Sequence, residues 1–83
     1  MTANPKFLRT AVLTMLNQTG DYKLPEEVIQ GQVTRAFPAA ASDAAAKALA
    51  WLHEKGFADY EVDHMTEEKR WKITDSGKAQ LSK

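Results

Sequence analysis

Apolar residues recur at helical spacing near the start of the chain. Leu8, Val12 and Met15 lie three or four residues apart, as on one face of an amphipathic helix. Ala11 and Leu16 widen this stripe. The Asn4-Pro5 pair suits a helix start, and Gly20 suits its end. This pattern predicts a first helix over about residues 4–18.

A second helix is expected over about residues 25–37. Pro25 suits its start, and the two acids that follow favour the positive end of the helix dipole. Its expected buried face consists of Val28, Ile29, Val33 and Phe37. Gly31 lies inside this helix at a cost of about 1 kcal/mol relative to alanine, which suggests close approach of another helix.

The third helix is predicted over about residues 42–55. Ser42 is a suitable N-cap with Asp43 in the first turn, and Gly56 terminates the helix. Its inner stripe is predicted to be Ala45, Ala48, Leu49 and Leu52. The remaining face is mostly alanine.

After Gly56 the apolar period changes from helical to two. Ala58, Tyr60 and Val62 alternate with acids, and Trp71 and Ile73 alternate with bases, around the polar stretch "HMTEE". Two alternating runs around a polar turn predict a β-hairpin over about residues 57–74. A short helix over about 75–82 should follow, and "DYKL" before the second helix should pair at a sheet edge.

Composition predicts a folded protein of one domain, residues 1–83. Apolar residues make up 43% of the 83 residues, and 11 Lys+Arg balance 11 Asp+Glu. Residues 1–20 carry two bases and no acid, whereas residues 57–75 carry six acids and three bases. The sequence has no cysteine, no apolar run near 20 residues and no secretory signal pattern. We therefore expect a cytoplasmic protein without membrane contact.

Catalytic and metal-binding patterns are absent from the sequence. It has no glycine-rich phosphate loop, and its serines have no adjacent base. Asp63, His64 and Glu67 match no metal-ligand motif, and a solvated turn explains them better. We predict no enzyme activity, no catalytic residue, no metal and no cofactor.

The element order and two motifs resemble a known fold. Residues 22–81 resemble the winged helix-turn-helix domains of small bacterial regulators of the MarR and PadR groups. The resemblance rests on "ALAWLHEKGFADYEVD" and "KRWKITDSGKAQL". Leu52, Gly56 and Phe57 match the family's end of the third helix, and Ile73 to Gly77 match its "LT-x-x-G". The resemblance implies an α+β fold with a three-helix core, a C-terminal hairpin wing and a short terminal helix, in a bacterial or phage protein.

This resemblance also implies double-stranded DNA as the partner. The third helix would enter the major groove, and the wing would contact the backbone or the minor groove. The positions that could contact DNA are Ser42, Lys47, Lys69, Arg70 and Lys72. Lys47 is the one strong base-reading donor on the third helix, and acids opposite the wing bases favour cross-strand pairing over phosphate contact. The expected DNA binding is therefore weak and dependent on dimerisation or on a partner.

A protein-interaction module is the alternative interpretation. Ala46, Ala50 and a half-exposed Trp51 would form its contact surface, since tryptophan is enriched at interaction hot spots. The simpler expectation is that Trp51 and Trp71 both pack between the third helix and the sheet. Lys6 and Arg9 could form a basic patch with Lys78 and Lys83, or remain scattered solvated lysines and arginine. Self-association is possible in either interpretation.

Overall fold

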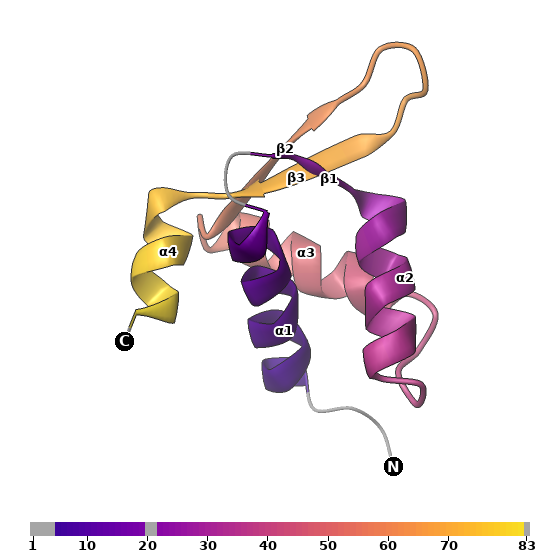
Figure 1. Ribbon diagram of the computed structural model, residues 1–83, viewed down its shortest axis with the longest axis vertical. Helices are drawn as coiled ribbons and strands as arrows, with labels where there is room; N and C mark the ends of the chain where they lie inside the picture. Colours follow the sequence, from indigo (N-terminus) through magenta and orange to yellow (C-terminus); the bar gives the residue numbers. More distant parts are fainter. Residues whose placement is uncertain (1–4, 20–21, 83) are drawn as a thin grey trace.

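The helices and strands occur in the order that the sequence pattern predicts (Figure 1). The computed structural model describes residues 5–19 and 22–82. Its elements are α1 (Pro5–Gln18), β1 (Leu24–Pro25), α2 (Glu26–Ala36), α3 (Ala44–Glu54), β2 (Ala58–Val62), β3 (Lys69–Ile73) and α4 (Asp75–Leu81). In this described part of the chain, no helix is long and apolar enough to cross a membrane.

The sheet has the strand order β1-β3-β2, with β3 paired antiparallel to both neighbours. Trp71 lies opposite Leu24 on one side and opposite Tyr60 on the other. The predicted hairpin is confirmed. The predicted edge strand is confirmed at Leu24, from which it continues to Pro25, whereas Tyr22 and Lys23 lie outside it. The buried side chains of the sheet are Trp71 and Ile73 on the central β3 and Ala58 on β2.

The core lies between the three long helices and one face of the sheet. On α3, Ala45, Ala48, Leu49 and Leu52 are buried as predicted. On α1, Leu13 is only 2% exposed although the predicted stripe omitted it, and the predicted Met15 is half-buried. The stripe on α1 is wider than expected because α1 packs against α2, α3, β3 and α4.

Two details of α2 differ from the sequence prediction. Val28 is 42% exposed, so the buried face consists of Ile29 and Val33 with the partly buried Phe37. Gly31 has nothing within 4 Å of the position that a Cβ would take. Close approach of another helix therefore does not explain this glycine.

The start of α3 also differs from the prediction. Asp43, not Ser42, is the N-cap residue, and its side chain makes no capping hydrogen bond. Instead its carboxylate lies 3.3 Å from the Lys47 ammonium. Ser42 lies in the turn before the helix and is exposed. The prediction that Ser42 is the N-cap was wrong because α3 begins at Ala44, one residue later than expected.

One tight joint connects α3, β3 and α4. Gly56 has φ +80, a left-handed conformation that glycine adopts without steric cost. The Thr74 hydroxyl donates to the Gly56 carbonyl over 2.6 Å and accepts from the Gly77 amide over 3.1 Å. A Cβ on Gly77 would collide with the Phe57 carbonyl. These contacts explain why the "LT-x-x-G" pattern needs threonine and glycine at these positions.

Candidate nucleic-acid interface

The outer face of α3 is open to solvent along its length. Its inner stripe is buried against α1 and α2, so the helical period turns Ala46, Lys47 and Ala50 outward. Methyl groups offer no hydrogen bonds to base edges, and Lys47 is the strongest donor on this face. The Asp43–Lys47 ion pair engages that donor, with 57% and 78% of the two side chains exposed. An exposed pair of this kind is worth under about 1 kcal/mol, so a phosphate could displace it.

The hairpin positions its bases next to acids. Arg70 lies opposite Glu61 in the strand register, but its guanidinium contacts Asp63 at 3.1 Å. Glu61 instead pairs with Lys23 at 2.7 Å, and this hydrogen bond with its positive charge lowers the pKa of Glu61. Lys72 lies opposite Asp59. The predicted cross-strand pairing of Arg70 is therefore confirmed, with Asp63 as its partner.

Lys69 is directed toward an aromatic ring. Its ammonium lies 5.1 Å from the centroid of the Tyr60 ring, within the range of a cation–π contact. Val62, which lies opposite Lys69, is 44% exposed. Alternation with Ala58 and Tyr60 would place Val62 inward, but Val62 is the last residue of β2, next to the turn, and is exposed there.

The Asp63 carboxylate makes two of the hydrogen bonds that hold the hairpin tip. The Asp63 side chain accepts hydrogen bonds from the amides of Met65, at 2.8 Å, and Thr66, at 3.3 Å. These amide bonds, with smaller effects from nearby positive groups, lower the pKa of Asp63. The next residues in the turn, Glu67 and Glu68, add two more acids to the tip. A tip of this charge opposes phosphate contact.

No metal site accompanies these acids. In the described ranges, no group of three His, Cys, Asp or Glu side chains could hold a metal ion. Asp63 is bonded to backbone amides and to Arg70. Its position in the turn is explained by these bonds.

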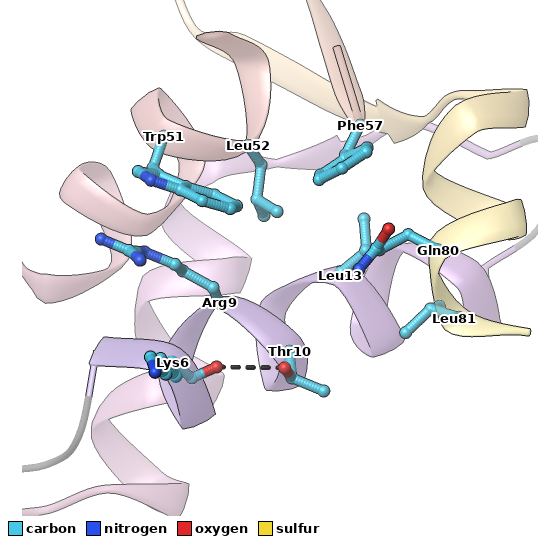
Figure 2. A pocket seen from close by; sticks show the side chains of 9 residues that line it. All are labelled: Lys6, Arg9, Thr10, Leu13, Trp51, Leu52, Phe57, Gln80 and Leu81. Carbon is cyan, nitrogen blue, oxygen red and sulfur yellow. Dashed lines mark hydrogen bonds between the residues drawn. The ribbon is translucent and has the colours of Figure 1, made fainter. Parts of the chain in front are cut away.

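A hollow of about 440 Å³ lies between α1, α3 and α4 (Figure 2). We call it the α1–α3–α4 hollow. Its apolar lining comes from Leu13, Leu52, Phe57, Leu81 and the Trp51 ring, and its cationic lining from Lys6 and Arg9. The Arg9 guanidinium lies 4.2 Å from the centroid of the Trp51 ring, and the Lys55 ammonium lies 5.7 Å from it.

The two tryptophans have different surroundings. Trp71 is buried in the core, as predicted. Trp51 instead packs against Arg9 and Phe57 on the α1 side of α3, where the Phe57 ring centroid is 6.1 Å away. The prediction that Trp51 packs against the sheet was wrong, because its position on α3 faces α1.

The basic patch predicted at the chain ends is only partly assembled. Lys6 and Arg9 line the α1–α3–α4 hollow, but Lys78 lines a different one together with Lys23 and Lys72. Lys83 lies outside the described residues. Sequence reasoning identified the two N-terminal bases but missed Phe57 and Leu81 beside them, because no local pattern links residues so far apart in the chain.

The three-helix core, central β3 and projecting hairpin together define a winged-helix fold. Among solved structures, the chain is similar to the PcaV transcriptional regulator from Streptomyces coelicolor, a MarR-family winged-helix protein solved in complex with its natural ligand. The TM-score is 0.71 at 19% identity, over 89% of this chain and 48% of that one. No family model and no curated protein matches the sequence.

This likeness shows the fold. The predicted winged-helix architecture and its resemblance to MarR-type regulators are confirmed at that level. The chain spans about half the length of the regulator that it matches.

Proposed function

We propose that the chain is a DNA-binding module of the winged-helix regulator type, with low intrinsic affinity and no catalytic role. The observation that carries this proposal is the fold likeness to a transcriptional regulator. By that likeness, the N-terminal half of α3 meets the major groove and the hairpin meets the backbone. Ser42, Lys47, Lys69, Arg70 and Lys72 are the proposed contacts.

The low affinity follows from the charges beside these contacts. Asp43 pairs with Lys47, and Asp63 pairs with Arg70. Each pair must open, or its acid must stay near phosphate, when DNA binds. A second copy or another protein would be needed to gather enough phosphate contacts for tight binding.

The test is a titration with mixed-sequence duplex DNA at low salt, followed by amide NMR and fluorescence anisotropy. Lys47→Ala should weaken binding for all sequences and reduce the salt slope by about 1. Asp43→Asn should tighten binding about two- to five-fold, because it frees Lys47 and removes a negative charge. Lys6→Ala, which changes a lysine of α1 that lines the α1–α3–α4 hollow and not the proposed interface, serves as the control and should change little.

The amide signals decide the outcome. Perturbation confined to residues 42–54 and 64–72 supports the proposal. If no amide in these ranges shifts at low salt, the proposal is wrong.

A protein-interaction module is the second candidate. It is favoured by the exposed Ala46 and Ala50 on α3, which permit close backbone approach, and by the acidic hairpin tip. Trp51 adds less to this surface than expected, because Arg9 covers its ring. Ala50→Arg separates the two functions: it should strengthen DNA binding if this face meets phosphate and leave it unchanged if the face binds protein.

A further inference from the structure

The α1–α3–α4 hollow combines an apolar floor with a basic rim. Five of its lining residues contribute apolar surface, two are cationic and none is acidic. Its volume of about 440 Å³ falls within the range of binding pockets. A complementary group must therefore be apolar at its centre and negatively charged at its edge.

Two cations lie near the Trp51 ring: Arg9, which lines the hollow, and Lys55, which lies beside the lining. The Arg9 guanidinium lies over the ring, 4.2 Å from its centroid. A guanidinium placed over an aromatic ring can still donate N–H groups to a carboxylate. Lys55 lies at 5.7 Å from the same centroid. Figure 2 shows the Arg9 side chain lying beneath Trp51, with Lys6 on the next turn of α1.

The chain itself carries a group of the required kind at the hairpin tip. Met65 is 93% exposed, and Glu67 and Glu68 follow it. The Asp63 carboxylate and two backbone bonds, Asp63 N–H to the Glu68 carbonyl at 2.8 Å and Glu67 N–H to the Asp63 carbonyl at 2.7 Å, fix the turn. A preorganised loop loses little conformational entropy on binding.

We propose that this chain associates head to tail, with Met65 of one copy entering the α1–α3–α4 hollow of the next. Glu67 and Glu68 then meet Arg9, Lys6 and Lys55 at the rim. A methionine side chain adapts to irregular apolar surfaces, and its sulfur packs favourably against aromatic rings such as Trp51 and Phe57. The contact goes beyond DNA binding and does not depend on it.

The geometry makes this contact intermolecular. The hairpin tip projects away from the helices at the far side of the molecule from α4, which borders the hollow (Figure 1). A tip and a hollow on different surfaces form a heterologous contact, so each added copy leaves one tip and one hollow open. Because a single turn covers little area, we expect a dissociation constant of about 0.1 to 1 mM.

The first experiment follows the wild-type chain from about 10 µM to about 1 mM, across the expected dissociation constant. Sedimentation velocity should show a mass that rises with concentration. In NMR spectra of the same samples, the Met65 methyl and the Trp51 indole N–H signals should shift together. A chain that stays monomeric to the highest concentration, or that associates without shifts at both signals, overturns the proposal.

The second experiment uses two variants that are each defective at one end. Met65→Asn removes the apolar anchor of the tip without adding charge, and Arg9→Glu disables the hollow, so neither should self-associate. Mixing them should restore one contact, between the intact tip of Arg9→Glu and the intact hollow of Met65→Asn. The product should stop at a 1:1 dimer, because the remaining tip and hollow are both defective.

Controls remove the alternative explanations. Lys55→Glu repeats the hollow defect without removing the Arg9–Trp51 contact, in case Arg9→Glu fails to fold. Tyr22→Ser and Arg35→Glu change exposed residues away from the tip and outside the hollow lining, and they should associate like the wild type. A mixture that remains monomeric, or single variants that associate like the wild type, would show that the tip does not enter the hollow.

Discussion

Gly31 and Gly77 both lie in helices, but their surroundings differ. The position of a Cβ on Gly31 has no neighbour within 4 Å. A Cβ on Gly77 would collide with the Phe57 carbonyl and would lie 2.7 Å from a side-chain carbon of Ile73. Only Gly77 is required by packing, so the two glycines provide a matched pair of substitutions.

Gly31→Ala should raise the free energy of unfolding by about 0.5–1 kcal/mol, because alanine loses less backbone entropy in a helix. Gly77→Ala should lower it by about 1–3 kcal/mol, because α4 must move away from Phe57. Urea unfolding monitored by circular dichroism measures both. Equal effects at the two positions would contradict the packing described for α4.

The stability of the β2–β3 hairpin depends on the ionised Asp63 carboxylate in its turn as well as on the pairing of its strands. The pKa of Asp63 is lowered mainly by the hydrogen bonds that its carboxylate accepts from the Met65 and Thr66 amides. Since the folded-state pKa lies below the unfolded value near 3.8, the stabilisation is fully present above that value. It is lost as the pH falls through the lower folded-state pKa.

Asp63→Asn should therefore lower the melting temperature at pH 7, and its effect should shrink as the pH falls below the folded-state pKa and the wild-type carboxyl becomes protonated. Thermal unfolding across this range measures the difference. Glu67→Gln changes a neighbouring exposed acid and is the control. If the Asp63→Asn difference were independent of pH, ionised Asp63 would not be what orders the turn.

For the whole molecule, Trp71 connects the sheet to the helical layer. Its ring lies 4.8 Å from that of Tyr60 and 6.1 Å from that of His53, between centroids. Its indole N–H donates to the Glu26 carboxylate over 3.2 Å, which links β3 to the first turn of α2. Trp71 therefore contacts side chains of three other elements, α2, α3 and β2.

Trp71→Ala should lower the free energy of unfolding by about 3–5 kcal/mol through the cavity that it leaves. Trp71→Phe and Glu26→Ala each remove the hydrogen bond, and their double-mutant cycle should give a coupling energy of about 1 kcal/mol. Denaturant unfolding of the four proteins gives this value. A coupling near zero would mean that the bond contributes nothing to the attachment of α2.

The sequence alone predicted the elements because their signals are local. The helical period of apolar residues identified the helices, with Pro25 at the start of the second and Gly56 at the end of the third. Alternation identified the hairpin, and the "LT-x-x-G" pattern identified the turn from the last strand into the last helix at Thr74 and Gly77. The errors at Ser42, Val28 and Val62 occur at element ends and edges. There, whether a side chain is covered depends on neighbouring elements and not on local spacing.

Tertiary structure decided which distant residues meet. Three such contacts join separate parts of the chain. Arg9 lies over the Trp51 ring, Glu61 pairs with Lys23, and Leu81 of α4 lines the hollow beside α1 and α3. Spacing along a chain determines which residues share a face, but packing of whole elements determines which faces come together. For this reason the sequence predicted a winged helix with a weak DNA-contact surface, whereas the basic, apolar hollow was found only in the folded chain.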